Sequence, residues 1–478
     1  MKRRRLGTVL ALAALLSSCG GGGGGTASSQ PPPNSGGGNP PPAATCSVRD
    51  RQNWAAAQIR EWYFFPETLP ASLDPAPYST VDDYIDALTA TARAQGRDRF
   101  FTYITSIAEE NAFINSGQSA GFGIRLALAS GSRLFVTEAF EGAPGLAAGI
   151  DRGTEILAIG TSSANLRTVS SILSSEGGAG ITNALGPNTA GTTRVLRIAD
   201  AGGTREVTVA KTDFELLPVS TRYGARIIND GGRQVGYVNL RTFIGTAEDA
   251  LEAAFRQFRA AGITEIIVDF RYNGGGLVRI ADLMGDLLGG NRAASEVFSY
   301  TAFRPEKAAQ YDDTRFFQPN SDAVSPTRIA FIGTGGTASA SELVINSFIP
   351  YLNGNVALVG TNTFGKPVGQ VGIDRAACDD RLRIVAFAAQ NAARQGAYYN
   401  GLAAVMPATC QAPDDITRPL GDPQEASIAR ALDFLAGRSC TPITSGIAAQ
   451  RMAAPAEQRE LLTPERPSAA QRDVPGLF

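Results

Sequence analysis

IIVDFRYNGGG, at residues 266–276, is a run of apolar, mostly β-branched residues that ends in a charged and glycine-rich stretch. The apolar half predicts a buried strand, and the glycines predict a loop with an accessible backbone. Similar apolar runs occupy residues 235–240, 329–332 and 356–359, and residues 247–260 have the spacing of an amphipathic helix. Strands that alternate with helices predict an α/β fold with a mainly parallel sheet covered on both faces.

Two further segments follow predicted strands: GGTASASE at residues 335–342 and TFGKPVGQ at residues 363–370. Loops at the carboxyl ends of parallel strands meet at one edge of a sheet, so we expect them to converge with the glycine loop. Taken alone, each segment also has a purely structural interpretation. The serine can cap a helix, the lysine can be a surface cation, and the glycines can form a tight turn.

Histidine is absent from the chain, and only four of its 43 basic residues are lysines, Lys366 among them. The commonest general base and the commonest metal ligand are therefore missing. A serine nucleophile needs a group that accepts its proton. A buried lysine can accept it because desolvation lowers the lysine pKa, whereas arginine does not deprotonate. The residues thus favour a Ser-Lys pair, and we expect no metal and no cofactor.

Between residues 119 and 212 the pattern changes to short β runs separated by glycines, with GFGI at 121–124 and APGLAAGIDRGTEILAI at 143–159. Both motifs resemble PDZ domains of the bacterial protease type. In such domains a glycine loop presents backbone N–H groups to a peptide carboxylate, and the next strand accepts the peptide as an added strand. A PDZ domain that serves only as a spacer is the alternative. The resemblance implies four peptide-binding residues: Gly121, Phe122, Gly123 and Ile124.

All the motifs together resemble those of the carboxy-terminal processing (tail-specific) serine peptidases, over roughly residues 50–440. The family motifs Asp-x-Arg-x-Asn-x-Gly-Gly, Ser-Ala-Ser-Glu and Thr-Phe-Gly-Lys stand here in order, with Pro367 where the family usually has glycine. The resemblance implies a PDZ domain and a catalytic core of the ClpP/crotonase-like type. It assigns the nucleophile to Ser339 rather than Ser341, the general base to Lys366, the orientation of that base to Gln370, and the oxyanion donors to the N–H groups of Gly275 and Ala340.

The N-terminus has the pattern of an exported, lipid-anchored protein. Basic residues 2–5 precede a short apolar stretch, and LSSCG at residues 16–20 resembles the bacterial lipobox, whose cysteine is acylated. We predict a lipoprotein signal peptide at 1–18, lipidation of Cys19 and a flexible Gly/Pro/Ser tether at 19–45. An ordinary secretory signal is the alternative. The predicted location is the bacterial cell envelope, with the outer membrane facing the periplasm favoured and the lipid as the sole membrane contact.

Composition divides the rest of the chain into four parts. The four predicted parts are an N-terminal helical region at 46–115 with helices at 52–63 and 81–95, the PDZ domain at 116–213, the Ser-Lys peptidase core at 214–440, and a disordered tail at 441–478. Within the last part, an inert end is the main expectation. The alternative is that the last six residues, DVPGLF, which are apolar, dock in a PDZ groove of the same chain or of a neighbour.

Four further cysteines, Cys46, Cys378, Cys410 and Cys440, lie beyond the predicted signal. An even number in an exported chain predicts disulfides, and the absence of a CxxC pair argues against a zinc site. Three pairings can be drawn. We favour Cys378–Cys410 together with Cys46–Cys440, because the second would join the start of the folded region to its end.

These features predict a serine endopeptidase that cuts envelope proteins or peptides near their C-termini, with apolar C-terminal tails held by the PDZ domain. A catalytically silent lipoprotein of the same fold that binds peptides or lipophilic ligands is the alternative. A lipid-held scaffold is a third interpretation, but it leaves the Ser-Lys pair without a role. The net charge of −2 implies no general attraction to nucleic acid. The sequence is compatible with an adaptor protein or a homo-oligomer.

Overall fold

The computed structural model describes residues 46–444 and 459–478. Its largest unit is built on a six-stranded sheet in the order β10-β11-β12-β15-β16-β19. Neighbouring strands from β11 to β19 run parallel, and β10 is antiparallel at one edge, so the predicted mainly parallel sheet is confirmed. The strands are β10 (Ala225–Asp230), β11 (Arg233–Asn239), β12 (Glu265–Asp269), β15 (Arg328–Gly333), β16 (Val356–Gly360) and β19 (Thr409–Gln411).

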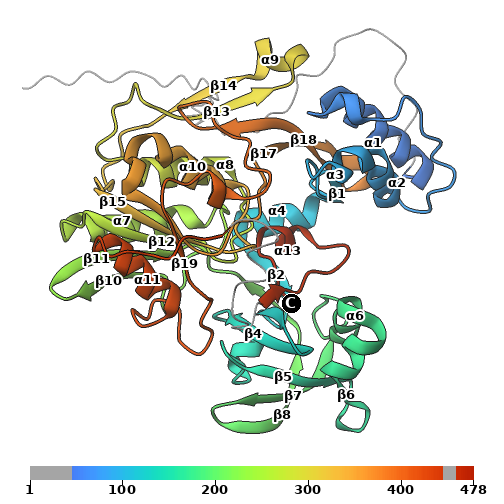
Figure 1. Ribbon diagram of the computed structural model, residues 1–478. Coiled ribbons are helices and arrows are strands. Elements are labelled where there is room, and N and C mark those ends of the chain that lie inside the picture. Colours follow the sequence, from blue (N-terminus) through green and yellow to red (C-terminus); the bar gives the residue numbers. More distant parts are fainter. Residues whose placement is uncertain (1–45, 445–458) are drawn as a thin grey trace, which may run out of the picture.

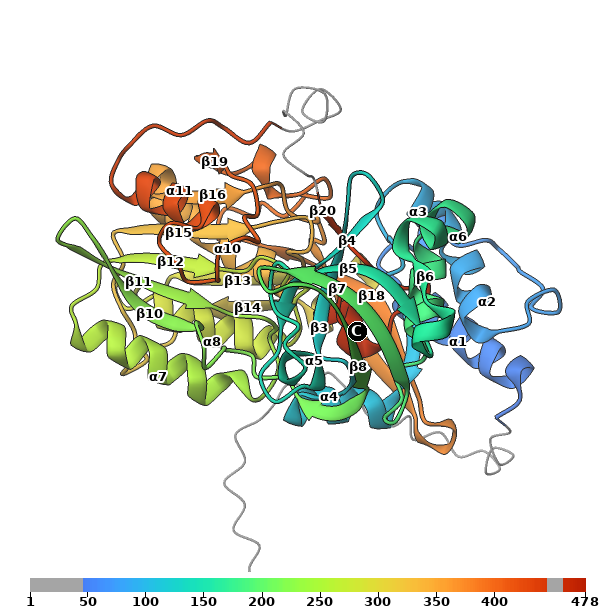
Figure 2. The same ribbon diagram turned by 90° about the horizontal axis from the view of Figure 1, so that it is seen from below.

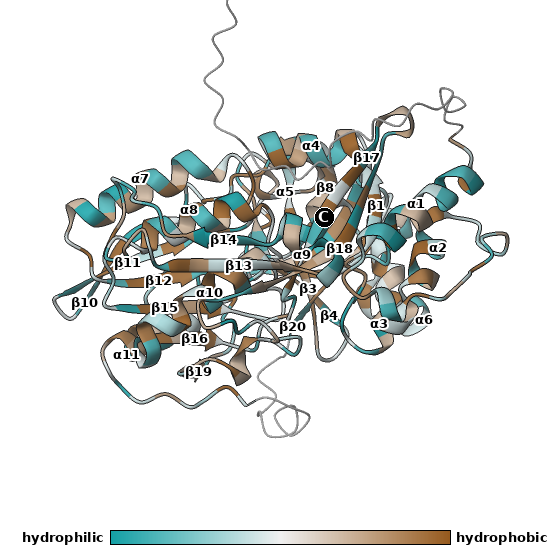
Figure 3. Cartoon of the chain, turned by 90° about the horizontal axis from the view of Figure 1, so that it is seen from above, coloured by the Kyte–Doolittle hydropathy of each residue, from teal (hydrophilic) through white to brown (hydrophobic). Residues whose placement is uncertain are grey.

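Helices cover both faces of this central sheet (Figure 3). Successive side chains of a strand point to opposite faces. Ile266 and Val268 of β12 therefore pack into the core under α7, α8 and α10, while Ile267 packs under α11. The helices are α7 (Ala247–Ala260), α8 (Val278–Leu288), α10 (Ala340–Leu352) and α11 (Ala426–Leu435).

A second, five-stranded antiparallel sheet joins the N-terminal region to the core, because β18 pairs with β1, β13 and β17. Helices α1 and α2 pack against this sheet. The helix predicted at 81–95 is interrupted at Thr89, whose hydroxyl donates to Ile85 O, a bond that competes with regular helix geometry. The elements are α1 (Val48–Trp62), α2 (Val81–Leu88), α3 (Ala90–Ala94), β1 (Tyr103–Ser106), α4 (Ile107–Ser116), β13 (Val297–Phe303), α9 (Pro305–Tyr311), β14 (Asp313–Phe316), β17 (Val368–Arg375) and β18 (Asp380–Gln390).

Residues 118–215 form a separate unit, called here the small β module. Viewed from below in Figure 2, the module lies in front, with the central sheet to one side and the N-terminal helices to the other. It coincides with most of the range predicted as a PDZ domain, and that assignment stays a prediction. Its elements are β2 (Gln118–Gly121), β3 (Ile124–Ala129), β4 (Arg133–Ala139), α5 (Pro144–Ala147), β5 (Glu155–Gly160), β6 (Arg167–Thr168), α6 (Val169–Leu185), β7 (Thr193–Asp200), β8 (Gly203–Ala210) and β9 (Thr212–Glu215).

Buried ion pairs fix the small β module against the larger unit. Glu138 of β4 pairs with Arg125 of β3 at 3.1 Å and with Arg241, which follows β11, at 2.6 Å. Arg152 of the module pairs with Asp414 of the core at 2.7 Å. A buried charge without a partner is strongly destabilising, so these pairs favour one position of the module over others.

The C-terminal segment differs from its prediction. A disordered tail was expected at 441–478, yet residues 459–478 form a short strand, a short helix and a buried end. Figure 1 shows the helix, labelled α13, close to the end of the chain. Strand β20 (Arg459–Leu461) pairs with β3, and helix α13 (Ala469–Asp473) follows. The composition of the tail is polar on average, but its apolar residues are concentrated at the end, where distant segments supply apolar contacts. Residues 445–458 lie outside the described part.

The favoured disulfide pairing is also wrong. All four cysteines are paired, but as Cys46–Cys378 and Cys410–Cys440. The first bond attaches the start of α1 to the β17–β18 connection, and the second attaches the segment after α11 to the end strand β19 of the central sheet. Pairing depends on which segments lie side by side, and cysteine spacing carries no information about that.

The signal peptide, the tether and Cys19 fall within residues 1–45, outside the described residues. Among the helices at 46–444 and 459–478, none has both the length and the apolar character needed to cross a membrane.

Candidate active site

Ser339 lies on a strained turn between β15 and α10. Its backbone has φ 55° and ψ −114°, a conformation that residues other than glycine rarely adopt. The turn leaves Ser339 half-buried at the start of α10, where the helix dipole favours negative charge. Ser341, by contrast, is fully buried and its hydroxyl donates to Asn273 O at 3.1 Å. The two serines therefore have different roles, with Ser341 holding the glycine loop.

Glu342 connects the turn at Ser339, called here the serine turn, to the loop between β16 and β17 that contains Lys366, called here the lysine loop. Its Oε2 accepts the backbone N–H groups of Ser339 at 3.1 Å and Lys366 at 2.7 Å. Its Oε1 accepts from the Thr363 hydroxyl at 2.6 Å and the Gly365 N–H at 2.7 Å. Burial raises the pKa of the Glu342 carboxyl, and these four hydrogen bonds act against that rise. One buried side chain thus fixes the positions of both candidate catalytic residues.

Lys366 is held by a polar contact with Gln370 and lies close to the Phe101 ring. Its Nζ donates to Gln370 Oε1 at 2.8 Å, and Nζ lies 5.0 Å from the centre of the Phe101 ring. Gln370 in turn donates to Phe101 O, so its amide is fixed in the orientation that presents oxygen to the lysine. Burial lowers the pKa of Lys366 to about 8. A substantial fraction of the lysine is then neutral in mildly alkaline solution, as a general base must be.

Arg99, from the N-terminal region, stabilises the lysine loop from outside. Its guanidinium donates to Phe364 O at 2.7 Å and to Gly365 O at 2.6 Å, and it lies over the Phe364 ring at 4.1 Å. The N-terminal region therefore contributes directly to the geometry of the site, since both Arg99 and Phe101 lie in it.

The glycine loop after β12 lies directly against the serine turn. A Cβ placed on Gly275 would be 2.8 Å from Ser339 Cβ and 3.2 Å from Ala340 N, so only glycine permits this approach. The predicted oxyanion donor at Gly275 is not free in this conformation, because its N–H donates to Asn273 Oδ1 at 2.9 Å. Ala340 is the first residue of α10, where helix N–H groups lack partners within the helix.

The structure thus brings Ser339, Ala340, Gly275, Lys366 and Gln370 to one edge of the central sheet. Within residues 46–444 and 459–478, no hydrogen bond joins Ser339 Oγ to Lys366 Nζ. The backbone N–H groups of Ser339 and Lys366 nevertheless both bind Oε2 of Glu342. The arrangement can support attack by a serine on a carbonyl carbon, with a lysine of lowered pKa as proton acceptor.

The predicted peptide-binding residues lie at a different place, along the β2–β3 connection of the small β module. Gly123 has φ 66°, and a Cβ there would come within 2.0 Å of Ala143 Cβ, so the position requires glycine. Phe122 is buried in the core of the module. Ile124 begins β3 and exchanges two backbone hydrogen bonds with Phe478: its N–H donates at 3.2 Å and its carbonyl accepts at 2.9 Å.

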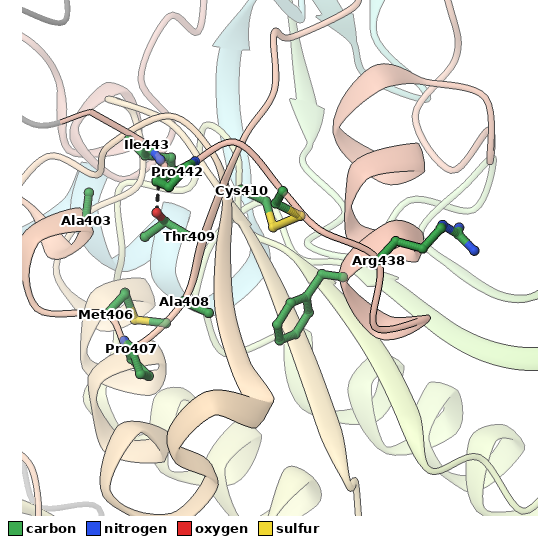
Figure 4. A pocket seen from close by; sticks show the side chains of 11 residues that line it. Ala403, Met406, Pro407, Ala408, Thr409, Cys410, Arg438, Pro442 and Ile443 are labelled. Carbon is green, nitrogen blue, oxygen red and sulfur yellow. Dashed lines mark hydrogen bonds between the residues drawn. A yellow bond between two sulfur atoms is a disulfide. The ribbon is translucent and has the colours of Figure 1, made fainter.

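A hollow of about 450 Å³ lies beside the Cys410–Cys440 disulfide, between residues 403–410 and residues 434–443 (Figure 4). Ile443 N–H donates to the Thr409 hydroxyl across it at 2.9 Å. None of the candidate catalytic residues lines this hollow, so it is no part of the site. In the part of the chain that the structure describes, no cluster of three or more acidic or cysteine residues could hold a metal ion.

Part of the chain matches a known protein family. Residues 234–394, which include the glycine loop, Ser339 and Lys366, match the model of peptidase family S41. The chain contains a peptidase family S41 domain. The S41 domain starts in β11 and ends just after β18, so it spans most of the central sheet and the whole of the lysine loop.

Two curated relatives are similar in sequence to part of this chain. Carboxyl-terminal-processing peptidase 3, chloroplastic, of Arabidopsis thaliana is 29% identical over 241 residues, covering 49% of this chain and 42% of that protein. A carboxyl-terminal-processing protease of Picosynechococcus sp. is 28% identical over 257 residues, covering 52% and 55%. The chain thus spans about half the length of the curated relatives it matches.

A solved structure described as an S41 protease, from Bacteroides fragilis, superposes with a TM-score of 0.63 at 22% identity. The match covers 80% of this chain and 97% of that one. It shows that the fold extends well beyond the S41 domain.

Sequence reasoning missed three contributors to the site. Glu342 was visible in the Ser-Ala-Ser-Glu motif, but its link to the lysine loop depends on tertiary structure. Asn273, whose side chain binds the Gly275 N–H and donates to Leu240 O at 2.8 Å, lay within a motif without an assigned role. Arg99 stands outside every motif, and no signal in the sequence marks it.

Proposed function

We propose that the chain is a serine-type endopeptidase that cleaves proteins or peptides with a Ser-Lys dyad formed by Ser339 and Lys366. The observation that carries the proposal is the carboxylate of Glu342, which binds the backbone N–H groups of both residues and so sets their separation. The S41 domain and the carboxyl-terminal-processing relatives support the same reaction class.

In the proposed reaction, Ser339 Oγ attacks the carbonyl carbon of a peptide bond while neutral Lys366 Nζ takes the hydroxyl proton. The resulting oxyanion is stabilised at the start of α10 by the Ala340 N–H and by an N–H of the glycine loop, where Gly275 becomes available when its bond to Asn273 opens. The C–N bond then breaks, and the lysine returns its proton to the leaving amine. Water activated by Lys366 hydrolyses the acyl-enzyme ester and releases the second product.

Gln370 keeps the base in place. Its amide oxygen accepts from Lys366 Nζ, and its amide nitrogen is fixed by Phe101 O. This fixed contact limits the lysine rotamers, which supports a productive distance to the serine when substrate is bound.

We infer that the small β module is a PDZ domain that binds apolar C-terminal segments along β3. The loop at residues 121–124 and the edge of β3 opposite β4, which binds residues of the same chain here, have the chemistry of β-strand addition, in which main-chain bonds supply affinity and side-chain pockets supply specificity. Substrates would then be proteins or peptides with apolar C-termini. The lipobox-like sequence supports a location in the bacterial envelope with Cys19 as the anchor.

The proposal is tested by incubating the full chain with an unfolded protein and following fragments by mass spectrometry, beside Ser339→Ala and Ser341→Ala. We expect fragments from wild type and none above background from Ser339→Ala, while Ser341→Ala keeps part of the activity. A wild-type chain that cuts nothing at any pH from 7 to 10 would favour the silent, ligand-binding alternative.

A further inference from the structure

The C-terminal segment of this chain fills the edge of β3 in two pieces. Residues 459–461 of β20 pair antiparallel with residues 127–129 of β3, and the Leu462 N–H continues the ladder to Leu126 O at 2.9 Å. Farther along the same edge, Leu126 N–H donates to Gly476 O at 2.8 Å, and Phe478 bonds to Ile124 in both directions. The segment therefore takes the hydrogen-bonding groups that an added peptide strand would need.

Phe478 anchors this segment in the module. Its side chain is 2% exposed and belongs to the same apolar cluster as Phe122, Ile124 and Val169. A Cβ on Gly121 would lie 2.8 Å from the carbonyl carbon of Phe478, so the end of the segment lies directly on the loop at residues 121–124 of the small β module. The seat of Phe478 is thus the apolar pocket next to the predicted peptide-binding residues.

Between the two pieces, the segment passes the candidate active site. The Gly274 N–H donates to Asp473 O at 2.9 Å, and a Cβ on Gly274 would be 2.3 Å from Arg472 O. The next residue, Gly275, is the one that lies against Ser339. The tail backbone is therefore bound one residue away from the glycine that contacts the candidate nucleophile.

Side chains on both sides fasten the segment at this point. Arg125 of β3 donates to Pro475 O at 2.6 Å and to Tyr272 O of the glycine loop at 2.9 Å, so one guanidinium bridges module, tail and core. Within the tail, Gln471 donates to Leu477 O at 2.8 Å. The negative charge of Asp473 acts to raise the pKa of Lys366, against the larger lowering by burial.

We propose that residues 459–478 are an intramolecular inhibitor, which occupies the peptide groove along β3 and the approach to Ser339 at the same time. The proposal rests on the proposed peptidase function. Substrates with an apolar C-terminal residue must displace Phe478 from its pocket before they are cut. The inhibitor is thus a competitor of the same chemistry as the substrate tail: a large apolar side chain with an extended backbone.

The strength of this inhibition can be calculated from one binding constant. A tethered segment competes at an effective concentration on the order of 1 mM. The groove is then open for a fraction of time equal to Kd divided by the sum of Kd and about 1 mM, where Kd is that of the free tail peptide. A peptide Kd of about 0.1 mM would predict about tenfold activation when the tail is released.

The experiment compares the full chain with a variant lacking residues 474–478 and with Phe478→Asp, which places a charge in the apolar pocket. Glu460→Gln is the matched control, because Glu460 lies in β20 of the same segment with an exposed side chain. We expect both tail variants to cut an unfolded protein about tenfold faster than wild type, and Glu460→Gln to match wild type. A synthetic peptide of residues 474–478, added to the deletion variant, should restore the inhibition, which excludes misfolding as the cause of activation.

Binding of the same peptide, labelled with a fluorophore, gives a readout that does not depend on cleavage. The deletion variant should bind it, and the full chain should bind it about tenfold more weakly. Equal binding to both chains would overturn the inhibitor, whatever the activity. If no chain cleaves protein but this difference in binding is found, the proposed peptidase function fails while the occupied groove stands. Two other results would overturn the proposal of an intramolecular inhibitor. One is equal cleavage by wild type and both tail variants. The other is loss of the tail from the wild-type chain but not from Ser339→Ala, seen by intact mass.

Discussion

Glu342→Gln is a sharp test of how the site is assembled. The carboxylate accepts four hydrogen bonds from Ser339, Thr363, Gly365 and Lys366. An amide has one acceptor oxygen, so in either orientation its NH₂ group faces two of these donors. Each buried donor left without a partner costs about 1–3 kcal/mol, or about 2–6 kcal/mol for two. Removal of a buried negative charge offsets part of this cost, because burial already raises the pKa of Glu342.

The kinetic effect should be larger than the effect on binding. If the lysine loop moves by about 1 Å relative to the serine, the rate falls on the order of 100-fold, since catalysis depends on close positioning. We expect kcat to fall by about this factor and KM to change little. The assay is cleavage of a fluorogenic peptide at pH 9, with unfolding followed by circular dichroism. Glu248→Gln is the control, because Glu248 forms an exposed ion pair with Arg279. Wild-type kcat together with an unchanged Tm in Glu342→Gln would refute the role of this carboxylate.

Four further predictions concern the base, the pH dependence of stability, the disulfides and the anchor. Activity should rise with pH through about 8 as Lys366 loses its proton, and Lys366→Arg should be inactive because arginine keeps the charge without the basicity; an unchanged profile in that variant would exclude Lys366 as the base. The pKa of Lys366 is 10.5 in the unfolded chain and about 8 in the folded chain, so between these pH values the unfolded chain binds more protons. The free energy of unfolding should therefore rise with pH in this range. Lys366→Met should remove this rise, as measured by chemical denaturation at several pH values. Cys46→Ser with Cys378→Ser should lower stability more than Cys410→Ser with Cys440→Ser, by about 2 kcal/mol from the separations of 332 and 30 residues; equal losses in urea titrations would contradict this. Cys19→Ser should release the protein from membranes on fractionation, and retention there would point to another membrane contact.

Local patterns predicted the central sheet well. The helix expected at 247–260 has those bounds in the structure, and the strands near 266, 329 and 356 lie within a residue or two of their predicted positions. The strands are continuous apolar runs buried on both faces of the sheet, and the helix has a regular apolar face that packs on the sheet while its other face is exposed. The same patterns placed Ser339 and Lys366 at the ends of neighbouring strands, because parallel topology alone brings those ends together.

Features that depend on long-range contacts were not predictable in this way. The disulfide partners are set by the packing of α1 on the second sheet and of the segment after α11 on β19. The tail is polar and aperiodic over most of its length, and although its last six residues are apolar, only the fold shows that Phe478 and Leu477 are buried among distant residues such as Ile124 and Phe140. Glu342, the residue that connects the serine turn and the lysine loop, reads from sequence as an ordinary helix-start acid.

The central claim, that Ser339 is a nucleophile activated by Lys366, is tested most directly by a serine-reactive fluorophosphonate. The full chain would be incubated with the probe at several pH values, digested, and the modified peptide identified by mass spectrometry. We predict a single adduct on Ser339, formed at a rate that rises through about pH 8 and lost in Lys366→Arg. An adduct on Ser341, or an adduct on Ser339 that forms at the same rate in Lys366→Arg, would contradict the claim.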